Sequence, residues 1–158
     1  MRRKDREVSA LDEKLAILDK CEVCRVAFSV DDQPYIVPLN FGYEMQGEAL
    51  VIYLHGAKKG KKADMLKQNP KVCFEMDTEH GVIKAEQPHN YSYSYASIIG
   101  FGLAELIEDT EQKIHGLKML MQKVDPGREF KFDVAPLAQT MVFKIICNEF
   151  TGKRRPKP

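Results

Sequence analysis

Residues 55–66 combine histidine, glycine and lysine in a pattern that could bind an anion. They read HGAKKGKKADML, which is the end of a predicted strand, a loop with two glycines and four lysines, and the start of a predicted helix. The N-terminal end of a helix carries partial positive charge, so lysines there are unfavourable unless something compensates. A bound phosphate would compensate, held by free backbone N–H groups together with Lys61 and Lys62. Gly56 and Gly60 would let the backbone approach the anion closely.

The same residues also fit a solvated lysine-rich loop, because runs of charge usually lie in water. The stretch is not a P-loop, since the pattern G-x-x-x-x-G-K-[ST] requires a hydroxyl side chain where this sequence has Lys62. Spacing alone favours the solvated loop, so the assignment of a phosphate site needs support from the rest of the chain.

The other side chains with metal-binding or nucleophilic chemistry form no recognisable site. Cys21 and Cys24 make a single C-x-x-C pair without a second half-site, and Cys73 and Cys147 stand alone on predicted strands. We therefore predict no metal ligand among them. With no secretory signal at the N-terminus, we expect reduced thiols and a cytoplasmic protein. The histidines other than His55 are scattered, and we expect structural or solvated roles for them: His80, His89 and His115.

The composition predicts a single globular domain over residues 1–158. Apolar residues make up 44% of the chain and charged residues 30%, and no apolar run is long enough for a membrane helix. The net charge of +1 gives no reason to expect nucleic acid or an anionic membrane as a partner. A small barrel that binds oligonucleotides needs a basic face with stacking aromatic side chains, and this chain has no Trp.

The hydrophobic pattern predicts a mainly β fold with flanking helices. Alternating apolar residues predict six strands, over residues 24–30, 35–43, 49–55, 72–76, 92–107 and 140–150. Helical spacing predicts three helices, over residues 11–18, 60–69 and 109–124. Asp109 and Gln112 form the pattern of a capping box at the start of the last helix. Short turns between the strands indicate an antiparallel, closed or partly closed barrel.

Some segments interrupt or end these patterns. Pro38 cannot donate a ladder hydrogen bond, which indicates an edge strand or a bulge. Gly100 and Gly102 indicate a bend or bulge in the long strand. Residues 80–90 are expected to form a loop. The basic chain ends, residues 1–6 and 153–158, are expected to be loose solvated tails.

Tyr91, Tyr93 and Tyr95 alternate along the long predicted strand and therefore share one face of it. Such a face could line a planar ligand, form a dimer interface or pack inside the sheet. The residue types leave these three interpretations open.

Taken in order, several stretches resemble the FMN-binding split-barrel family. The resemblance is to its pyridoxamine phosphate oxidase-related branch, of the Nim type (5-nitroimidazole resistance). It rests on the stretches YIVPLNFGY at 35–43, YLHGA at 53–57, GKK at 60–62, NP at 69–70, YASIIGFG at 95–102 and TGK at 151–153. One departure is Ala96, where the Nim-type group often has a basic residue.

The resemblance implies a six-stranded antiparallel split β-barrel that binds FMN at the interface of a homodimer. It places Val37, Pro38, Leu39 and Asn40 along the edge of the isoalloxazine ring. It places His55 and Gly56 beside the ring and the ribityl chain, and Lys61 and Lys62 on the phosphate. Ser97 is expected to reach the cofactor from the neighbouring subunit.

The function that follows is an FMN-dependent oxidoreductase acting on a small-molecule electron acceptor, with nitroaromatic, nitroimidazole-like compounds as candidates. His55 is the expected catalytic proton donor, and a purely structural role for its ring is the open alternative. The other function considered is a flavin- or haem-binding carrier or sensor without dedicated turnover.

Overall fold

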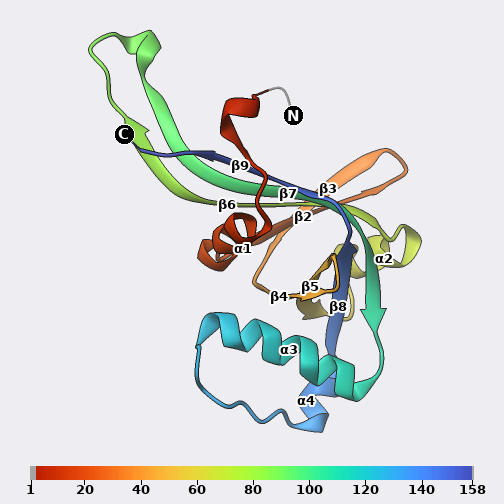
Figure 1. Cartoon of the computed structure of the whole chain (residues 1–158). Helices are drawn as coiled ribbons and strands as arrows, with labels where there is room; N and C mark the ends of the chain where they lie inside the picture. Colours follow the sequence, from red (N-terminus) through yellow and green to blue (C-terminus); the bar gives the residue numbers. More distant parts are fainter. Residues whose placement is uncertain (1–2, 158) are drawn as a thin grey trace.

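The computed structural model describes residues 3–157, except for the side chain of Val134, and contains nine strands in that range (Figure 1). The strands are β1 (Glu7–Val8), β2 (Cys24–Val30), β3 (Gln33–Leu39), β4 (Phe41–Gln46), β5 (Ala49–Ala57), β6 (Lys71–Ile83), β7 (Ser92–Ile107), β8 (Thr140–Cys147) and β9 (Phe150–Arg155). The α-helices are α1 (Leu11–Lys20), α2 (Lys61–Gln68), α3 (Thr110–Val124) and α4 (Val134–Gln139), with 3-10 turns η1 (Lys4–Arg6) and η2 (Pro88–Asn90).

The strands form one open antiparallel sheet, which confirms the predicted mainly β fold of the split-barrel type. The order is β3-β2-β6-β7-β8-β5-β4, with β9 paired to both β7 and β1. β3 and β4 follow one another in the chain yet lie at opposite ends of this order, and no pairing between them is present among the described strands. The sheet is therefore split rather than closed.

The structure has nine described strands where the sequence predicts six, because two predicted strands are each divided and the short strand β1 was not predicted. The stretch 35–43 is broken at Asn40, where the chain leaves β3 for β4, and the stretch 140–150 is broken after Cys147. The stretch 35–43 alternates through its break, whereas Asn148 and Glu149 interrupt the apolar alternation of 140–150 directly after Cys147. The choice of pairing partner, which is a long-range property, decides the break at Asn40.

The C-terminal basic end is not a loose tail as far as Arg155, because residues 153–155 belong to β9, so the prediction is wrong for these residues. Lys153 of β9 pairs with Ser97 of β7 on one side and with Glu7 of β1 on the other. Backbone pairing satisfies the N–H and C=O groups whatever the charge of the side chains, which is why a basic segment can form a strand. Met1, Arg2 and Pro158 lie outside the described residues.

β7 is the longest strand, with the predicted bounds, and it connects the two halves of the sheet. It pairs with β9 up to Gly100 and with β8 from Leu103 onward. A Cβ at Gly100 would collide with the ring of Phe74, so the close packing at this change of partner requires glycine. The register shift in the β6–β7 ladder lies instead between Thr78 and Gly81.

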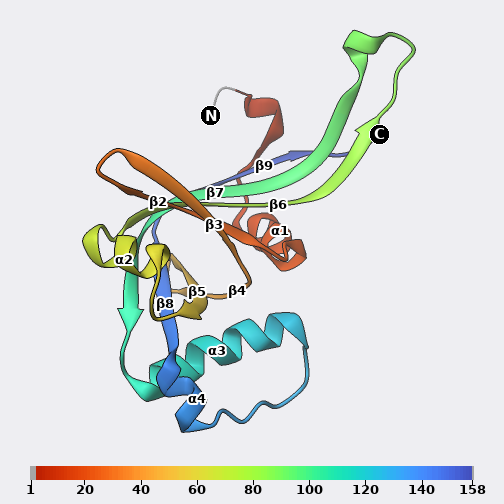
Figure 2. The ribbon, with the colours of Figure 1, turned by 180° about the vertical axis from the view of Figure 1, so that it is seen from behind.

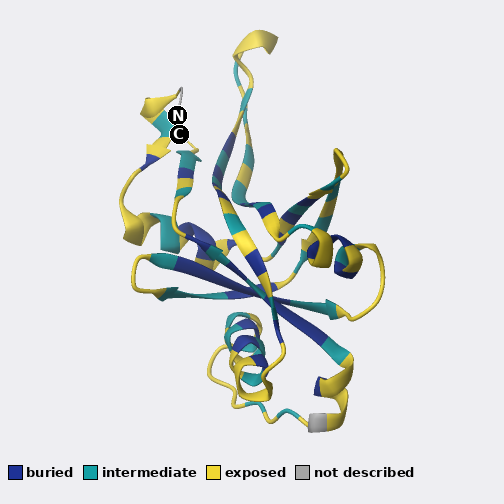
Figure 3. Ribbon diagram, turned by 90° about the vertical axis from the view of Figure 1, so that its right-hand side faces the viewer, coloured by how far each residue is buried: buried dark blue, intermediate teal, exposed yellow. Residues whose placement is uncertain are grey.

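β6 runs further than predicted, into the expected loop at residues 80–90. With the first part of β7 it forms a hairpin arm that extends away from the body of the molecule, and its tip is exposed (Figure 3). Tyr93 lies exposed on this arm and Tyr95 is half-buried, whereas Ser94 and Ala96 between them are buried. The predicted common face of the tyrosines is therefore the outer face. Tyr91, just before β7, is exposed as well.

α3 lies over β4, β5 and β8 (Figure 2). Its N-cap is Asp109, whose carboxylate accepts a hydrogen bond of 2.9 Å from the backbone N–H of Gln112, as the capping box predicts. Because β5 has this helix on one side and the main core on the other, residues 50–54 are buried on both faces. None of the helices described between residues 3 and 157 has the length and apolar character needed to span a membrane.

Candidate functional site

The loop between β5 and α2 ends at a helix N-terminus that the protein leaves uncapped. Gly60 is the N-cap residue, with φ of 114° in the region that favours glycine, and no side chain makes a capping hydrogen bond there. Lys61 and Lys62 occupy the first turn. The first N–H groups of α2 therefore face an acceptor from outside the helix, or water.

Lys62 turns back from α2 onto the end of β5. A Cβ at Gly56 would overlap its ammonium group and lie 3.0 Å from its Cε, so the lysine can take this position only over a glycine. The side chain is half-buried, and burial lowers the pKa of Lys62 from its ordinary value. The same glycine and the same lysine are those that the sequence assigns to the phosphate loop.

His55 lies directly before this glycine, half-buried at the end of β5. Its Nδ1 is shielded from solvent and has no hydrogen-bond partner among the described residues. Burial, and next the positive charge of Lys62, lower the pKa of His55 below its ordinary 6.5. The ring is therefore mostly neutral at pH 7, with a buried nitrogen whose hydrogen-bonding capacity is unused.

Lys61 joins the same region to β3. Its ammonium group lies 4.5 Å from the centre of the Tyr35 ring, a cation–π contact. Among the described residues no carboxylate oxygen lies within 4.0 Å of the ammonium group of Lys61 or Lys62. Tyr35 is not among the site residues predicted from the sequence. Its position two residues before Val37, on the same face of the strand, was the available signal.

The predicted ring-edge segment, residues 37–40, forms the end of β3 and the step into β4. β3 lies at one end of the sheet order, so Pro38 is on an edge strand as predicted, and its side chain is exposed. The Asn40 amide donates to the carbonyl of Glu22 at 3.4 Å. Phe41 pairs with Leu54, so Asn40 and His55 lie at the same end of the β4–β5 ladder.

Ser97 is the member of the predicted set that the fold separates from the others. It lies in the middle of β7, half-buried on the outer face, and its ladder neighbours are Asp77 and Lys153. At this point β7 is paired with β9, and β8 lies between β7 and β5 in the sheet order. Within one chain β8 therefore separates Ser97 from His55, whereas His55, Gly56 and Lys62 lie together.

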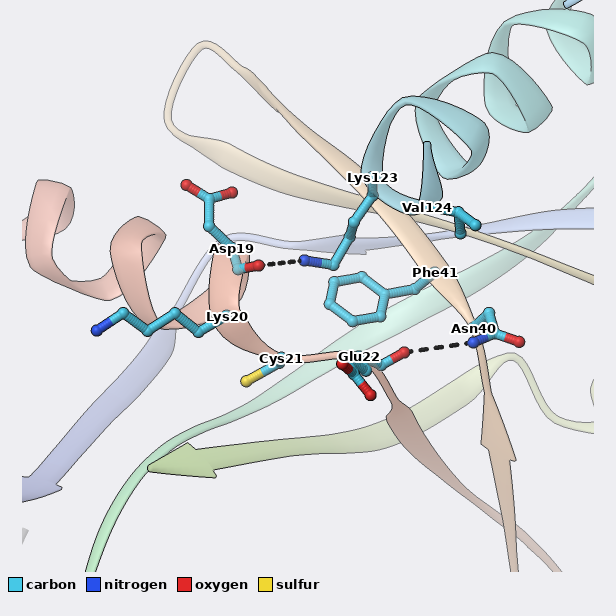
Figure 4. A pocket seen from close by; sticks show the side chains of 8 residues that line it. All are labelled: Asp19, Lys20, Cys21, Glu22, Asn40, Phe41, Lys123 and Val124. Carbon is cyan, nitrogen blue, oxygen red and sulfur yellow. Dashed lines mark hydrogen bonds between the residues drawn. The ribbon is translucent and has the colours of Figure 1, made fainter. Parts of the chain in front are cut away.

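A cavity of about 350 Å³ adjoins Asn40, between the end of α1, the start of β4 and the end of α3 (Figure 4). Lys123 lies over the Phe41 ring at 4.8 Å and donates hydrogen bonds of 2.8 Å to the carbonyls of Leu18 and Asp19. No spacing in the sequence indicated this lysine. The cavity extends the site along the predicted ring-edge segment but does not include His55 or the lysines of α2.

The cysteines and the remaining histidines do not add to this site. Burial raises the pKa of the Cys21 thiol to about 11 and raises that of Cys24 further, so both are poor nucleophiles at neutral pH. His80 and His115 contact carboxylates, of Asp77 at 2.7 Å and of Glu44 at 3.0 Å, in structural roles. The described residues contain no group of three side chains suited to hold a metal ion.

The observed residues fit a phosphorylated flavin. Two lysines without carboxylate partners and an uncapped helix N-terminus suit a phosphate. The orphaned Nδ1 of His55 suits a polar group of a bound molecule, which would remove the cost of leaving that nitrogen unpaired. The free edge of β3 presents backbone groups that no described strand uses.

Comparisons with known proteins agree with this fold. A candidate 5-nitroimidazole antibiotic resistance protein from Bacteroides thetaiotaomicron has a TM-score of 0.81 and 29% identity, over 94% of this chain and 86% of that chain. An FAD-binding protein from Mesorhizobium loti has a TM-score of 0.65 and 27% identity, over 95% and 97%. An FAD- and haem-binding protein from Mycobacterium smegmatis shares the fold at 23% identity, with a TM-score of 0.82 over 97% and 75%.

The family model of pyridoxamine 5'-phosphate oxidase matches residues 11–154. This range begins at α1 and ends in β9, so it includes the whole region around α2 as well as the long strand β7. Since the match extends over nearly the entire chain, the protein belongs to the pyridoxamine 5'-phosphate oxidase family.

Proposed function

We propose that this protein is an FMN-dependent oxidoreductase that reduces a small organic acceptor, with nitroaromatic compounds as candidate acceptors. The observation that carries the proposal is the pair of lysines without carboxylate partners at the uncapped start of α2, next to the orphaned Nδ1 of His55. The similarity to the FAD-binding protein from Mesorhizobium supports a flavin, and the similarity to the candidate 5-nitroimidazole resistance protein from Bacteroides suggests the acceptor class. Bound FMN would supply the redox chemistry, and the protein would supply position and electrostatics.

Each residue then has a definite task. Lys61, Lys62 and the first N–H groups of α2 bind the phosphate. The backbone of residues 37–40, on the free edge of β3, hydrogen-bonds the polar edge of the ring. The glycine at position 56 leaves the space that Lys62 occupies, and so keeps this ammonium group directed toward the end of β5.

His55 holds or donates a proton at the acceptor. An acceptor that gains negative charge needs a hydrogen-bond donor, and an imidazole at the end of β5 can supply one. The lowered pKa of His55 means that its protonated fraction is small at pH 7 and grows only below the ordinary value of 6.5. A phosphate bound to Lys62 would offset the positive charge that contributes to this lowering.

The outer face of the sheet supports a homodimer. Phe101 is 72% exposed and Ile36 is 62% exposed, and Ile99 and Leu103 are also exposed on β7. Apolar residues gathered on one face usually mark an interface. Ser97 lies on the same face of β7, which supports a role for Ser97 of the partner subunit at the cofactor.

The absorbance spectrum of the purified protein tests the proposed cofactor. We expect flavin bands near ~370 and ~450 nm, and chromatography of the released cofactor should identify FMN. A Soret band would instead indicate haem and favour the carrier or sensor function. If the protein shows flavin bands but its reduced flavin is not reoxidised faster when nitroaromatic compounds are added, the proposed activity is wrong. The proposed cofactor would still stand.

Replacement of both lysines, Lys61→Ala with Lys62→Ala, should weaken FMN binding about a hundredfold or more. Charge-assisted hydrogen bonds contribute about 1.5–3 kcal/mol each, and about 1.4 kcal/mol corresponds to a factor of ten. Fluorescence titration of the apoprotein measures the affinity. Riboflavin, which has no phosphate, should bind nearly equally to both proteins, and unchanged FMN affinity in the variant would place the phosphate elsewhere.

The variant His55→Asn should retain FMN but reduce acceptors at least about tenfold more slowly, because a positioned proton donor contributes a large factor to the rate. The parent rate should rise as the pH falls through 6.5, with its midpoint below that value because the pKa of His55 is lowered. The Asn variant should lose this pH dependence. Full activity with an unchanged profile would show that His55 is structural.

Phe101→Asp should weaken the homodimer and reduce FMN occupancy together, because a carboxylate on this face would be desolvated in the interface. Leu11→Asp is the matched control, since Leu11 is 48% exposed but lies at the start of α1. Sedimentation of both variants and of the parent measures the association. A parent that sediments as a monomer of 18.1 kDa at micromolar concentration would refute the dimer.

A further inference from the structure

A second group of lysines surrounds a small cavity on the other side of α2. The cavity has a volume of about 110 Å³, and its lining includes Lys58 from the loop before α2, Lys67 from the last turn of α2 and Lys113 from α3. Thr140 and Glu108 also line it. At roughly 30 Å³ per water molecule, the volume holds three or four waters, which is about the size of one phosphate group.

Lys113 distinguishes this cavity from a chance gathering of surface lysines. The residue is only 7% exposed, although lysines are rarely buried unless paired. Its one carboxylate neighbour among the described residues is Glu108 at 3.8 Å, beyond hydrogen-bond distance, and that side chain is 82% exposed. Lys113 therefore brings a charge into the protein without a close counter-ion of its own.

The other charges do not supply the missing counter-ion. Lys58 and Lys67 are exposed, and neither forms an ion pair with a carboxylate in the part of the chain that is described. Three ammonium groups against one solvent-directed carboxylate leave the cavity with excess positive charge. The hydroxyl of Thr140 donates to the carbonyl of Pro136 at 3.1 Å, which holds it at the rim.

The cavity adjoins the proposed flavin phosphate site but shares none of its residues. Thr140, Met141 and Val142 line the cavity, and in the β5–β8 ladder they pair with Ala57, Gly56 and His55. Successive residues of a helix are rotated by about 100°, so Lys67 lies about 140° around α2 from Lys62. Lys62 faces the end of β5, whereas Lys67 lines the cavity with the end of β7 and the start of β8.

We propose that this cavity binds a phosphate group of a nucleotide, in addition to the flavin phosphate. The occupant is a phosphate because the cavity is small and three lysines line it against one carboxylate, Glu108. The rest of the lining is Thr140 and four aliphatic residues (Leu106, Ile107, Met141 and Val142), with no aromatic side chain for a base to stack on. The nucleotide has two possible sources, the adenylate half of FAD and a nicotinamide nucleotide that delivers electrons. Both nucleotides present the same phosphate chemistry. The choice between them rests on the proposed function, whereas the existence of an anion site does not.

Titration with inorganic diphosphate tests the site independently of any flavin. The Lys61→Ala, Lys62→Ala protein is the background, because it has lost the proposed flavin phosphate site. Calorimetry at low ionic strength should still detect binding there, since screening is weak. Adding Lys58→Ala with Lys67→Ala, or Lys113→Met alone, should weaken this binding about tenfold or more. Lys118→Ala, an exposed lysine of α3 outside the cavity, should have no effect.

Absence of binding in the background protein, or binding that survives the cavity substitutions, would overturn the proposal. Methionine keeps the length of Lys113 without its charge. If that variant does not fold, the exposed pair Lys58 and Lys67 decides the result.

The Lys113→Met substitution in a protein that retains Lys61 and Lys62 identifies which nucleotide binds, by its effect on the binding of FAD, FMN, NADPH and NADH. Weaker binding of FAD with unchanged binding of FMN in the Lys113→Met variant would assign the adenylate half of FAD. A raised KM for NADPH or NADH, with unchanged flavin binding, would assign the electron donor. If the binding of neither nucleotide changes, the proposal that the cavity binds a nucleotide is wrong, and the cavity is an anion site only. These outcomes differ from a failure of the flavin itself, which the absorbance spectrum reports.

Discussion

The backbone ladder of β7 holds the two halves of the sheet together, and the position of every other element depends on it. The strand pairs with β6 along its length, with β9 on its first half and with β8 on its second half. The change of partner between Gly100 and Leu103 requires a strand without a side chain at the point where Phe74 packs. A larger residue at Gly100 would push the ring aside and separate β7 from its neighbours.

The site is assembled from both halves of this split sheet. β8 carries β5 and its terminal His55 on one side of β7, while β6 and β2 carry β3 on the other. α2 links β5 to β6, and its first residue reaches back to Tyr35 of β3. Through this contact the start of α2, which follows β5, lies against β3 at the other end of the open sheet. An open sheet, unlike a closed barrel, leaves the edge of β3 free for a ligand.

Several lysines without close carboxylate partners gather around α2. Some cations elsewhere contact carboxylates: Arg25 contacts Glu75 and Asp77, Lys20 contacts Glu79, and Lys144 contacts Glu105. Within the described residues Lys58, Lys61, Lys62 and Lys67 form no ion pair, and Lys113 has only Glu108, at 3.8 Å. A net charge of only +1 therefore conceals a local excess of positive charge, and both proposed phosphate sites lie in that excess.

Elements whose signals are local could be predicted from the sequence. The capping pair at Asp109, the bounds of β7 and the glycine–lysine start of α2 follow from neighbouring residues, and the resemblance to the split-barrel family agreed with them. The tertiary structure alone decided the break at Asn40 and the pairing of the basic end with β7. It also decided the orphaned nitrogen of His55 and the burial of Lys113. Local periodicity records which face of an element is buried, whereas partner choice and charge burial depend on residues far away in the chain.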